Sequence, residues 1–258
     1  MKAVEGCDLY LEEPSMAKTK WKKIIVAGPL VIETVYPAVP SCGTPKARAE
    51  KKKLSSAAQQ RMNKMYSYQK LELLLAANFR KGDLVCTLTY DDAHLPKSRK
   101  AAEGKLKYFR EKLARVRRRC GQKLVMAWNI EGKHGEGRYH HHVVINATGK
   151  DYAQLLGLWG QGEIDIKPLQ IDKDRNYGTL AAYMCKEQPE KPGQRTWSYT
   201  RNCAKPEIET FRVESDTQIQ APKGALVMGD VSEKNAYGAY RWIKYIYLQK
   251  RRRCKRKK

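Results

Sequence analysis

Three of the chain's five histidines stand together in the stretch 138–146, RYHHHVVIN. The apolar residues that follow them favour a β-strand, and side chains on a strand alternate between its two faces. His140 and His142 are therefore expected on one face and His141 on the other. Two imidazoles spaced in this way can chelate one metal ion, which needs a further ligand from a neighbouring element.

A Gly-rich turn separates this strand from the stretch KLVMAWNIE (123–131), so the two are predicted to form a hairpin. Glu131 ends the first strand beside the histidines and is the expected third ligand. His134 and Glu136 in the turn are the alternatives. Two nitrogens and one carboxylate leave coordination positions open, as catalysis requires. The competing interpretation is a set of surface histidines hydrogen-bonded to water.

A tyrosine on a predicted helix, 174–187, is the candidate nucleophile. At 100° per residue the apolar side chains share one helix face, and Tyr183 lies at its polar border. Lys186 follows on the same side, where an ammonium would favour phenolate and stabilise negative charge on a phosphate. By composition Tyr177 is an equal candidate, and Tyr183 can equally be a packing residue.

The remaining patterns predict the elements that hold these side chains. Strands are expected at 83–90, 123–131, 139–146 and 163–170, and helices at 55–79, 98–119, 151–159 and 174–187. The order βαββαβα predicts an α+β fold, an antiparallel sheet with helices packed on one face. Pro168 places the last of these strands at a sheet edge.

The charge points to a polyanionic partner. Lys and Arg number 51 against 27 Asp and Glu, which gives a net charge of +24 and favours nucleic acid over a merely solvated basic face. An apolar stripe along the helix 98–119 is expected to face the sheet and to leave the basic side outward. The DNA-binding candidates are Arg115, Arg117, Arg118, Arg119, Arg138 and Tyr139.

Composition along the chain predicts four segments. These are an N-terminal extension with short strands and a basic linker (1–53), a main domain (54–206), a C-terminal extension with weak strand patterns (207–249) and a basic tail (250–258). Seven scattered cysteines without a C-x-x-C pair argue against a disulfide scaffold and a structural zinc finger, and they fit a reducing cytoplasm. Prolines break the apolar run near the N-terminus, so no membrane span is expected.

Three motifs, in order, resemble those of the HUH endonucleases: LVCTLTYDD, RYHHHVVIN and AAYMCKE. The chain looks most like the single-tyrosine replication initiators (Rep proteins) of rolling-circle plasmids and phages, of the filamentous-phage gene II type. WSYTRNCAKP (197–206) also resembles a segment that follows the third motif in that family. The resemblance covers about residues 55–206.

The resemblance implies the ferredoxin- or RRM-like HUH fold and a nick in one DNA strand at a replication origin. Tyr183 would attack the scissile phosphate and form a 5′-phosphotyrosine link with release of a 3′-OH. His140, His142 and Glu131 would hold a divalent metal, Mg²⁺ or Mn²⁺. His141 stands where the family usually has a bulky apolar residue.

The implied partners are single-stranded origin DNA and a host helicase and polymerase, because the chain has no G-x-x-x-x-G-K-[ST] motif. The implied location is the cytoplasm of a bacterial host, with the gene on a plasmid or phage. With one tyrosine, termination needs a second subunit or another nucleophile, so the oligomeric state stays open.

Two other functions stay open. One is an HUH relaxase or transposase, whose chemistry would be the same and whose gene would lie beside a transfer origin or transposon ends. The other is a non-catalytic, RRM-like module that binds single-stranded nucleic acid on stacking platforms such as Tyr90, Trp128 and Tyr139. Such a module would have no need for the two histidines and Glu131.

Overall fold

The computed structural model describes residues 19–38, 56–132, 138–149, 151–171, 177–186, 194–235 and 238–247. His134 and Glu136, the alternative ligands in the turn, and the predicted basic tail lie outside these residues. Within the described part of the chain, no helix has the length and apolar character needed to cross a membrane.

One antiparallel sheet carries the predicted motifs. It consists of β3 (Leu84–Leu88), β4 (Met126–Glu131), β5 (His140–Ile145), β6 (Ile164–Pro168) and β7 (Trp197–Tyr199), in the order β6-β3-β5-β4-β7. A short 3₁₀ helix, η1 (Asp92–His94), follows β3. The helices α2 (Arg99–Arg119), α3 (Asp151–Trp159) and α4 (Gly178–Met184) fall between the strands as expected. The α+β class, the order βαββαβα, the β4–β5 pairing and the edge position of β6 are confirmed.

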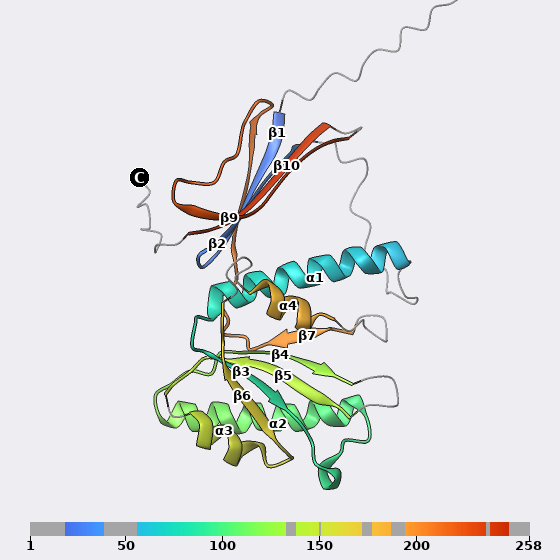
Figure 1. Ribbon diagram of the computed structural model, residues 1–258, viewed down its shortest axis with the longest axis vertical. Helices are drawn as coiled ribbons and strands as arrows, with labels where there is room; N and C mark the ends of the chain where they lie inside the picture. The colour runs from blue at the N-terminus through green and yellow to red at the C-terminus, as the bar shows by residue number, and fades with distance from the viewer. Residues whose placement is uncertain are drawn as a thin grey trace, which may run out of the picture.

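Helices cover both faces of this sheet, so the expectation that they pack on one face is wrong (Figure 1). α2 and α3 pack on one face, against apolar side chains such as Met126 and Val143. α4 and the long helix α1 (Ala57–Asn78) lie on the other, over Ala127 and Val144. The physical reason is that β4 and β5 carry apolar residues at successive positions, which a sheet needs when both of its faces are buried.

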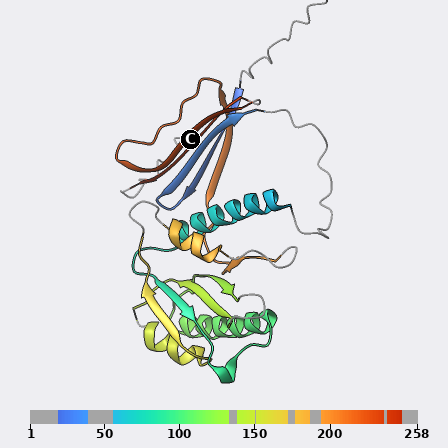
Figure 2. The same cartoon turned by 45° about the vertical axis from the view of Figure 1, so that its right-hand side comes forward.

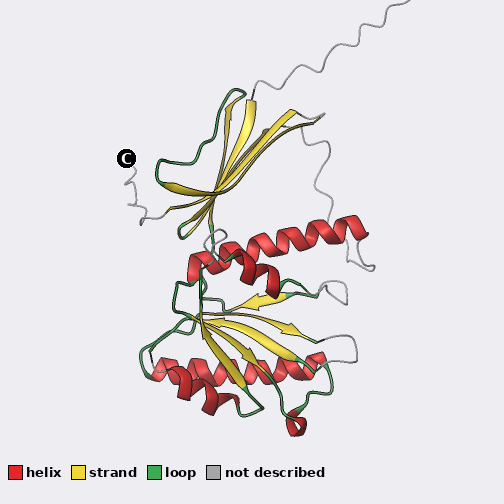
Figure 3. Ribbon diagram, in the orientation of Figure 1, coloured by secondary structure: helices red, strands yellow, loops and turns green. Residues whose placement is uncertain are grey.

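A second antiparallel sheet joins the two ends of the chain (Figure 3). Its strands are β1 (Thr19–Ala27), β2 (Leu30–Pro37), β8 (Glu207–Glu214), β9 (Ala225–Asn235) and β10 (Gly238–Tyr247), in the order β8-β1-β2-β10-β9. Strands from the predicted N-terminal and C-terminal extensions therefore pair directly, β1 with β8 and β2 with β10. The boundaries of the four predicted segments stay a prediction.

α1 lies between the two sheets and contacts both (Figure 2). In the turn between β1 and β2, Gly28 has φ +58°, and a Cβ there would lie 2.4 Å from the Ala76 carbonyl oxygen on α1. Glu72 of α1 is buried and receives a 2.5 Å hydrogen bond from the Lys244 ammonium of β10. One apolar cluster includes residues of the second sheet, α1, α4 and the central sheet. The two sheets therefore share part of their core through α1.

Candidate active site

The register of the β4–β5 hairpin brings together the residues predicted to hold a metal. Glu131 stands opposite His140 in the register, and His142 stands two residues further along the same face. The Glu131 carboxylate oxygen Oε2 lies 3.1 Å from His140 Nε2 and 2.7 Å from His142 Nε2. One ligand atom from each of the three residues lies within 4.8 Å of the others. The cluster could hold a metal ion.

The chemistry of the three donors fits a divalent cation. Two imidazole nitrogens share a single carboxylate oxygen, and a metal ion would take these lone pairs in place of protons. Both histidines present Nε2 to the cluster, and the other ring nitrogen of His142 has its own partner. Thr87 Oγ1 on the neighbouring strand β3 lies 3.2 Å from His142 Nδ1. Metal-binding histidines commonly have such a partner on the second nitrogen, because it fixes the ring and its tautomer.

α4 places Tyr183 at this cluster. The Tyr183 hydroxyl lies 3.1 Å from His142 Nε2, and its ring meets the His142 ring edge-on at 4.7 Å between centroids. The tyrosine is 43% exposed, so an incoming strand can approach its oxygen. Ala181 and Met184 anchor the opposite side of α4 in the core.

Lys186 completes the group from just beyond the end of α4. Its ammonium forms an ion pair with Glu131 Oε1 and lies 4.4 Å from the centre of the Tyr183 ring. The ammonium of Lys64 on α1 donates a 3.3 Å hydrogen bond to the Lys186 carbonyl, which ties α1 to this end of the helix. The sequence pattern Y-x-x-K thus brings a phenol and a positive charge to the same carboxylate.

The pKa shifts favour a charged carboxylate and a charged ammonium beside a neutral imidazole. Burial alone would raise the pKa of Glu131, but hydrogen bonds with Lys186 and His142 hold it below its usual value. Burial alone would lower the pKa of Lys186, but the hydrogen bond and ion pair with Glu131 raise it. Burial lowers the pKa of His142, although Glu131 opposes that change. At neutral pH, His142 is therefore in the state that binds a metal.

The comparisons with known proteins agree with this geometry. Residues 83–188 match the model of the family described as replication-associated protein ORF2/gene II protein. The chain therefore carries a replication-associated domain of this family. No curated protein and no solved structure matches the chain. The matched segment begins just before β3, ends beyond α4 and contains all five residues of the cluster. It is consistent with the resemblance to Rep-type initiators.

His141 points away from the cluster, into the core on the other face of the replication-associated domain. It is fully buried, its Nε2 lies 2.6 Å from the Tyr90 hydroxyl, and its ring contacts Trp159. Burial lowers the pKa of His141 to about 3, so this imidazole is neutral. Tyr90 is buried with it, so the expectation that Tyr90 serves as a stacking platform is wrong. Trp128, another expected platform, lies under the guanidinium of Arg110 at 4.9 Å.

The predicted DNA-binding residues do not form one surface. Arg115, Arg118 and Arg119 are exposed on α2, on the face of the sheet opposite the cluster. Arg138 and Tyr139 immediately precede β5, beside the cluster, and Arg138 is exposed and forms an ion pair with Asp92. Tyr139 is half-buried over Gly132, where an added Cβ would lie 2.3 Å from the ring.

Arg117 does not face outward, so its placement among the exposed basic residues is wrong. It is 0% exposed, and its guanidinium donates hydrogen bonds to Asp151 (2.8 Å) and Asn146 (2.6 Å). The apolar stripe of α2 reaches the core through Leu113, and Arg117 occupies the next turn on that side. A buried carboxylate in reach makes this position suitable for an arginine.

Two residues of this region gave no indication in the sequence. Thr87 contacts His142 from a strand chosen only for its apolar pattern. Asn129 lies two residues before Glu131 on the same face of β4 and is 3% exposed, and its Oδ1 has no hydrogen-bond partner among the described residues. The alternation of β4 could have placed Asn129 on this face, but a lone asparagine in a strand has no characteristic spacing.

Proposed function

We propose that this protein is a rolling-circle replication initiator that nicks single-stranded origin DNA through a metal-assisted attack by Tyr183. The observation that carries the proposal is the position of the Tyr183 hydroxyl, 3.1 Å from a nitrogen of the Glu131–His140–His142 cluster. A nucleophile beside a metal-binding group of open coordination is the arrangement that phosphoryl transfer needs.

The proposed step forms one bond and breaks one. The Tyr183 oxygen bonds to the scissile phosphorus, and the bond from phosphorus to the 3′ oxygen of the preceding nucleotide breaks. The phenol loses one proton and the leaving 3′ oxygen gains one, so the products are a 5′-phosphotyrosine and a free 3′-OH. The phosphodiester energy is kept in the tyrosine link, which allows the strand to be rejoined without a nucleotide cofactor.

The other residues of the cluster have separate roles in this proposal. Lys186, held charged by Glu131, offsets the negative charge that grows on the phosphate and on the phenol oxygen. His140, His142 and Glu131 would hold a divalent ion, Mg²⁺ or Mn²⁺, which polarises the scissile phosphate when bound.

The family match favours replication over mobilisation or transposition. The proposed substrate is single-stranded DNA at an origin, with Arg138 and Tyr139 beside the cut and the exposed arginines of α2 on a separate face. The proposed partners are a host helicase and polymerase, and the proposed location is the cytoplasm of a bacterial host. A binding-only function gains no support from the structure, because the buried Tyr90 offers no stacking surface.

A covalent adduct assay tests the proposal. The full-length protein, Mn²⁺ and a fluorescent single-stranded oligonucleotide that contains the origin are mixed, and the adduct is resolved on a denaturing gel. Tyr183→Phe should lose the adduct and keep its affinity for the oligonucleotide.

Tyr177→Phe is the control, because the Tyr177 ring is buried and its hydroxyl donates to the Phe79 carbonyl at 2.5 Å. It should form the adduct. If Tyr177→Phe loses the adduct and Tyr183→Phe keeps it, the nucleophile has been wrongly assigned.

A further inference from the structure

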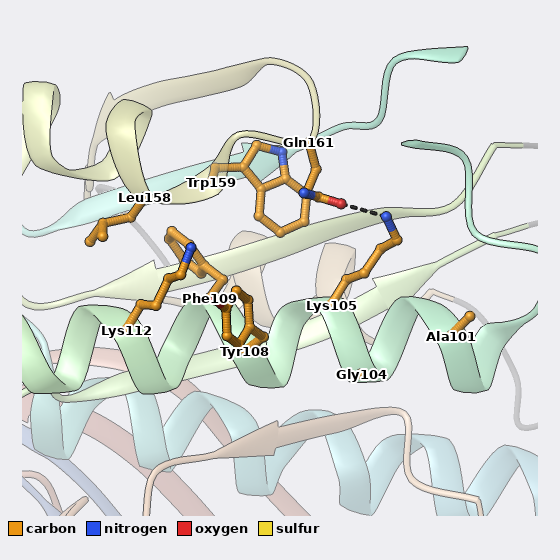
Figure 4. Close-up of a pocket in the computed structure, with 9 residues that line it drawn as sticks. All are labelled: Ala101, Gly104, Lys105, Tyr108, Phe109, Lys112, Leu158, Trp159 and Gln161. Atoms are coloured by element: carbon orange, nitrogen blue, oxygen red, sulfur yellow. Dashed lines mark hydrogen bonds between the residues drawn. The ribbon is translucent and has the colours of Figure 1, made fainter. Parts of the chain in front are cut away.

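A groove lies between α2 and α3, on the face of the central sheet that is remote from Tyr183. It has a volume of about 370 Å³, within the size range of ligand pockets. Figure 4 shows its walls, the side chains of Tyr108 and Phe109 on α2 opposite Leu158 and Trp159 at the end of α3. None of these residues contacts the candidate active site.

The interior of the groove is apolar, and its polar groups are already engaged. The Trp159 indole nitrogen donates a 2.8 Å hydrogen bond to the Thr89 carbonyl. The Gln161 amide nitrogen donates to the Gly160 carbonyl at 3.1 Å, and its oxygen accepts from the Lys105 ammonium. A ligand group that enters here meets rings and a leucine side chain rather than hydrogen-bonding partners.

The rim is positively charged. Lys105 and Lys112 stand on the two sides of the Tyr108–Phe109 pair (Figure 4). They are two helical turns apart, which is about 10 Å along the helix axis. The Lys112 ammonium lies 4.3 Å from the centre of the Tyr108 ring, and Tyr108 is 61% exposed. An anionic ligand with an apolar centre complements this combination of charge and surface.

We propose that this groove binds an acidic peptide segment of a partner protein, through one bulky apolar side chain flanked by carboxylates. In an extended peptide, the two residues next to the apolar one lie about 7 Å apart, and the following pair about 13 Å. These separations span the spacing of Lys105 and Lys112, so carboxylates on both sides of the anchor can reach a lysine.

A nucleobase fits the same groove less well. It would bring several donors and acceptors into a lining whose amide and indole groups are occupied, and unpaired buried polar atoms oppose binding. Phe109 and Trp159 are buried, so they offer no open ring face for stacking. The exposed ring of Tyr108 already has an ammonium over one face. These contacts favour an apolar side chain over a base.

Binding of synthetic peptides to the full-length protein tests the proposal. The probes are fluorescein-labelled heptapeptides with phenylalanine, leucine or tryptophan at the centre and two aspartates on each side. At least one should bind in fluorescence anisotropy. Replacing its central residue with alanine should weaken binding about 10- to 100-fold, the value of burying one large apolar side chain.

Matched variants locate the site. Tyr108→Ala and Lys112→Glu should each weaken peptide binding at least fivefold. Tyr152→Ala removes a tyrosine of similar exposure, 64%, from α3 outside the groove and should not. Lys107→Glu makes the same charge change on the outer side of α2 and should have a smaller effect than Lys112→Glu.

Three results would overturn the proposal. The first is the absence of binding by every peptide of the set at millimolar concentration. The second is equal binding of the alanine peptide, which would mean attraction by charge alone. The third is a loss of affinity for single-stranded DNA in Tyr108→Ala but not in Tyr152→Ala, which would assign the groove to nucleic acid.

Discussion

Thr87→Val should weaken metal binding although Thr87 is not a proposed ligand. Valine keeps the volume of threonine but removes the oxygen that lies 3.2 Å from His142 Nδ1. In the metal-bound state His142 must turn Nε2 to the ion, so its Nδ1–H is left without this acceptor in a nearly buried ring. An unpaired buried donor costs about 1–3 kcal/mol, or roughly five- to 150-fold in affinity. The 10- to 100-fold effect typical of such outer partners lies within this range.

Calorimetric titration of Mn²⁺ into the purified protein measures the effect. Thr87→Ser keeps the hydroxyl and should bind Mn²⁺ almost as well as the wild type. Thr89→Val is a second control, because the Thr89 hydroxyl donates to the Glu163 carbonyl and does not contact a histidine. If Thr87→Val binds Mn²⁺ within twofold of the wild type, Thr87 does not orient His142. Equal losses in Thr87→Ser and Thr87→Val would point to packing rather than to the hydroxyl.

Three further outcomes are expected. His142→Ala should lose Mn²⁺ binding, whereas His141→Ala should lose thermal stability and keep it; equal losses of metal would contradict the assignment of the two faces of β5. Arg117→Met should lower the free energy of unfolding in urea by about 3–5 kcal/mol, because it leaves Asp151 buried without its cation, whereas the exposed Arg115→Met should change it by less than about 0.5 kcal/mol. Burial alone would raise the pKa of Asp151, but hydrogen bonds and the guanidinium lower it, so its stabilisation is complete above the ordinary carboxyl pKa and is lost as pH falls through the lower folded value. Asp151→Asn should therefore flatten the acid limb of the stability curve, and an unchanged limb would contradict this.

The sequence predicts the site well where the positions of side chains follow from local periodicity. Alternation along β5 separates His140 and His142 from His141 without any tertiary information, and the structure has that separation. The hairpin then requires only a register to bring Glu131 opposite His140. The helical period likewise places Tyr183 beside, rather than within, the apolar face of α4.

The parts that could not be predicted depend on partners distant in the chain. Arg117 has the same local pattern as its basic neighbours, and only Asp151 and Asn146 decide that it is buried. The covering of the second sheet face by α1 depends on contacts with α4 and with strands at both ends of the chain. The polar residues of β8 and β9 give weak strand patterns because much of their surface is exposed, so the pairing of β1 with β8 has no local indication.

The pairing of β1 with β8 also sets an order for folding during synthesis. The hairpin of β1 and β2 leaves the ribosome early, but its neighbours β8 and β10 begin at Glu207 and Gly238. At about 5–20 residues per second, β8 begins to emerge roughly 10–35 s after β2 is complete. An isolated hairpin is marginally stable, so in that interval α1 is the nearest apolar surface that can shelter it. The replication-associated domain can close while the hairpin waits, and the second sheet closes only when the chain is almost finished. A chain that stops before residue 207 would leave both edges of the hairpin open to pairing with other molecules.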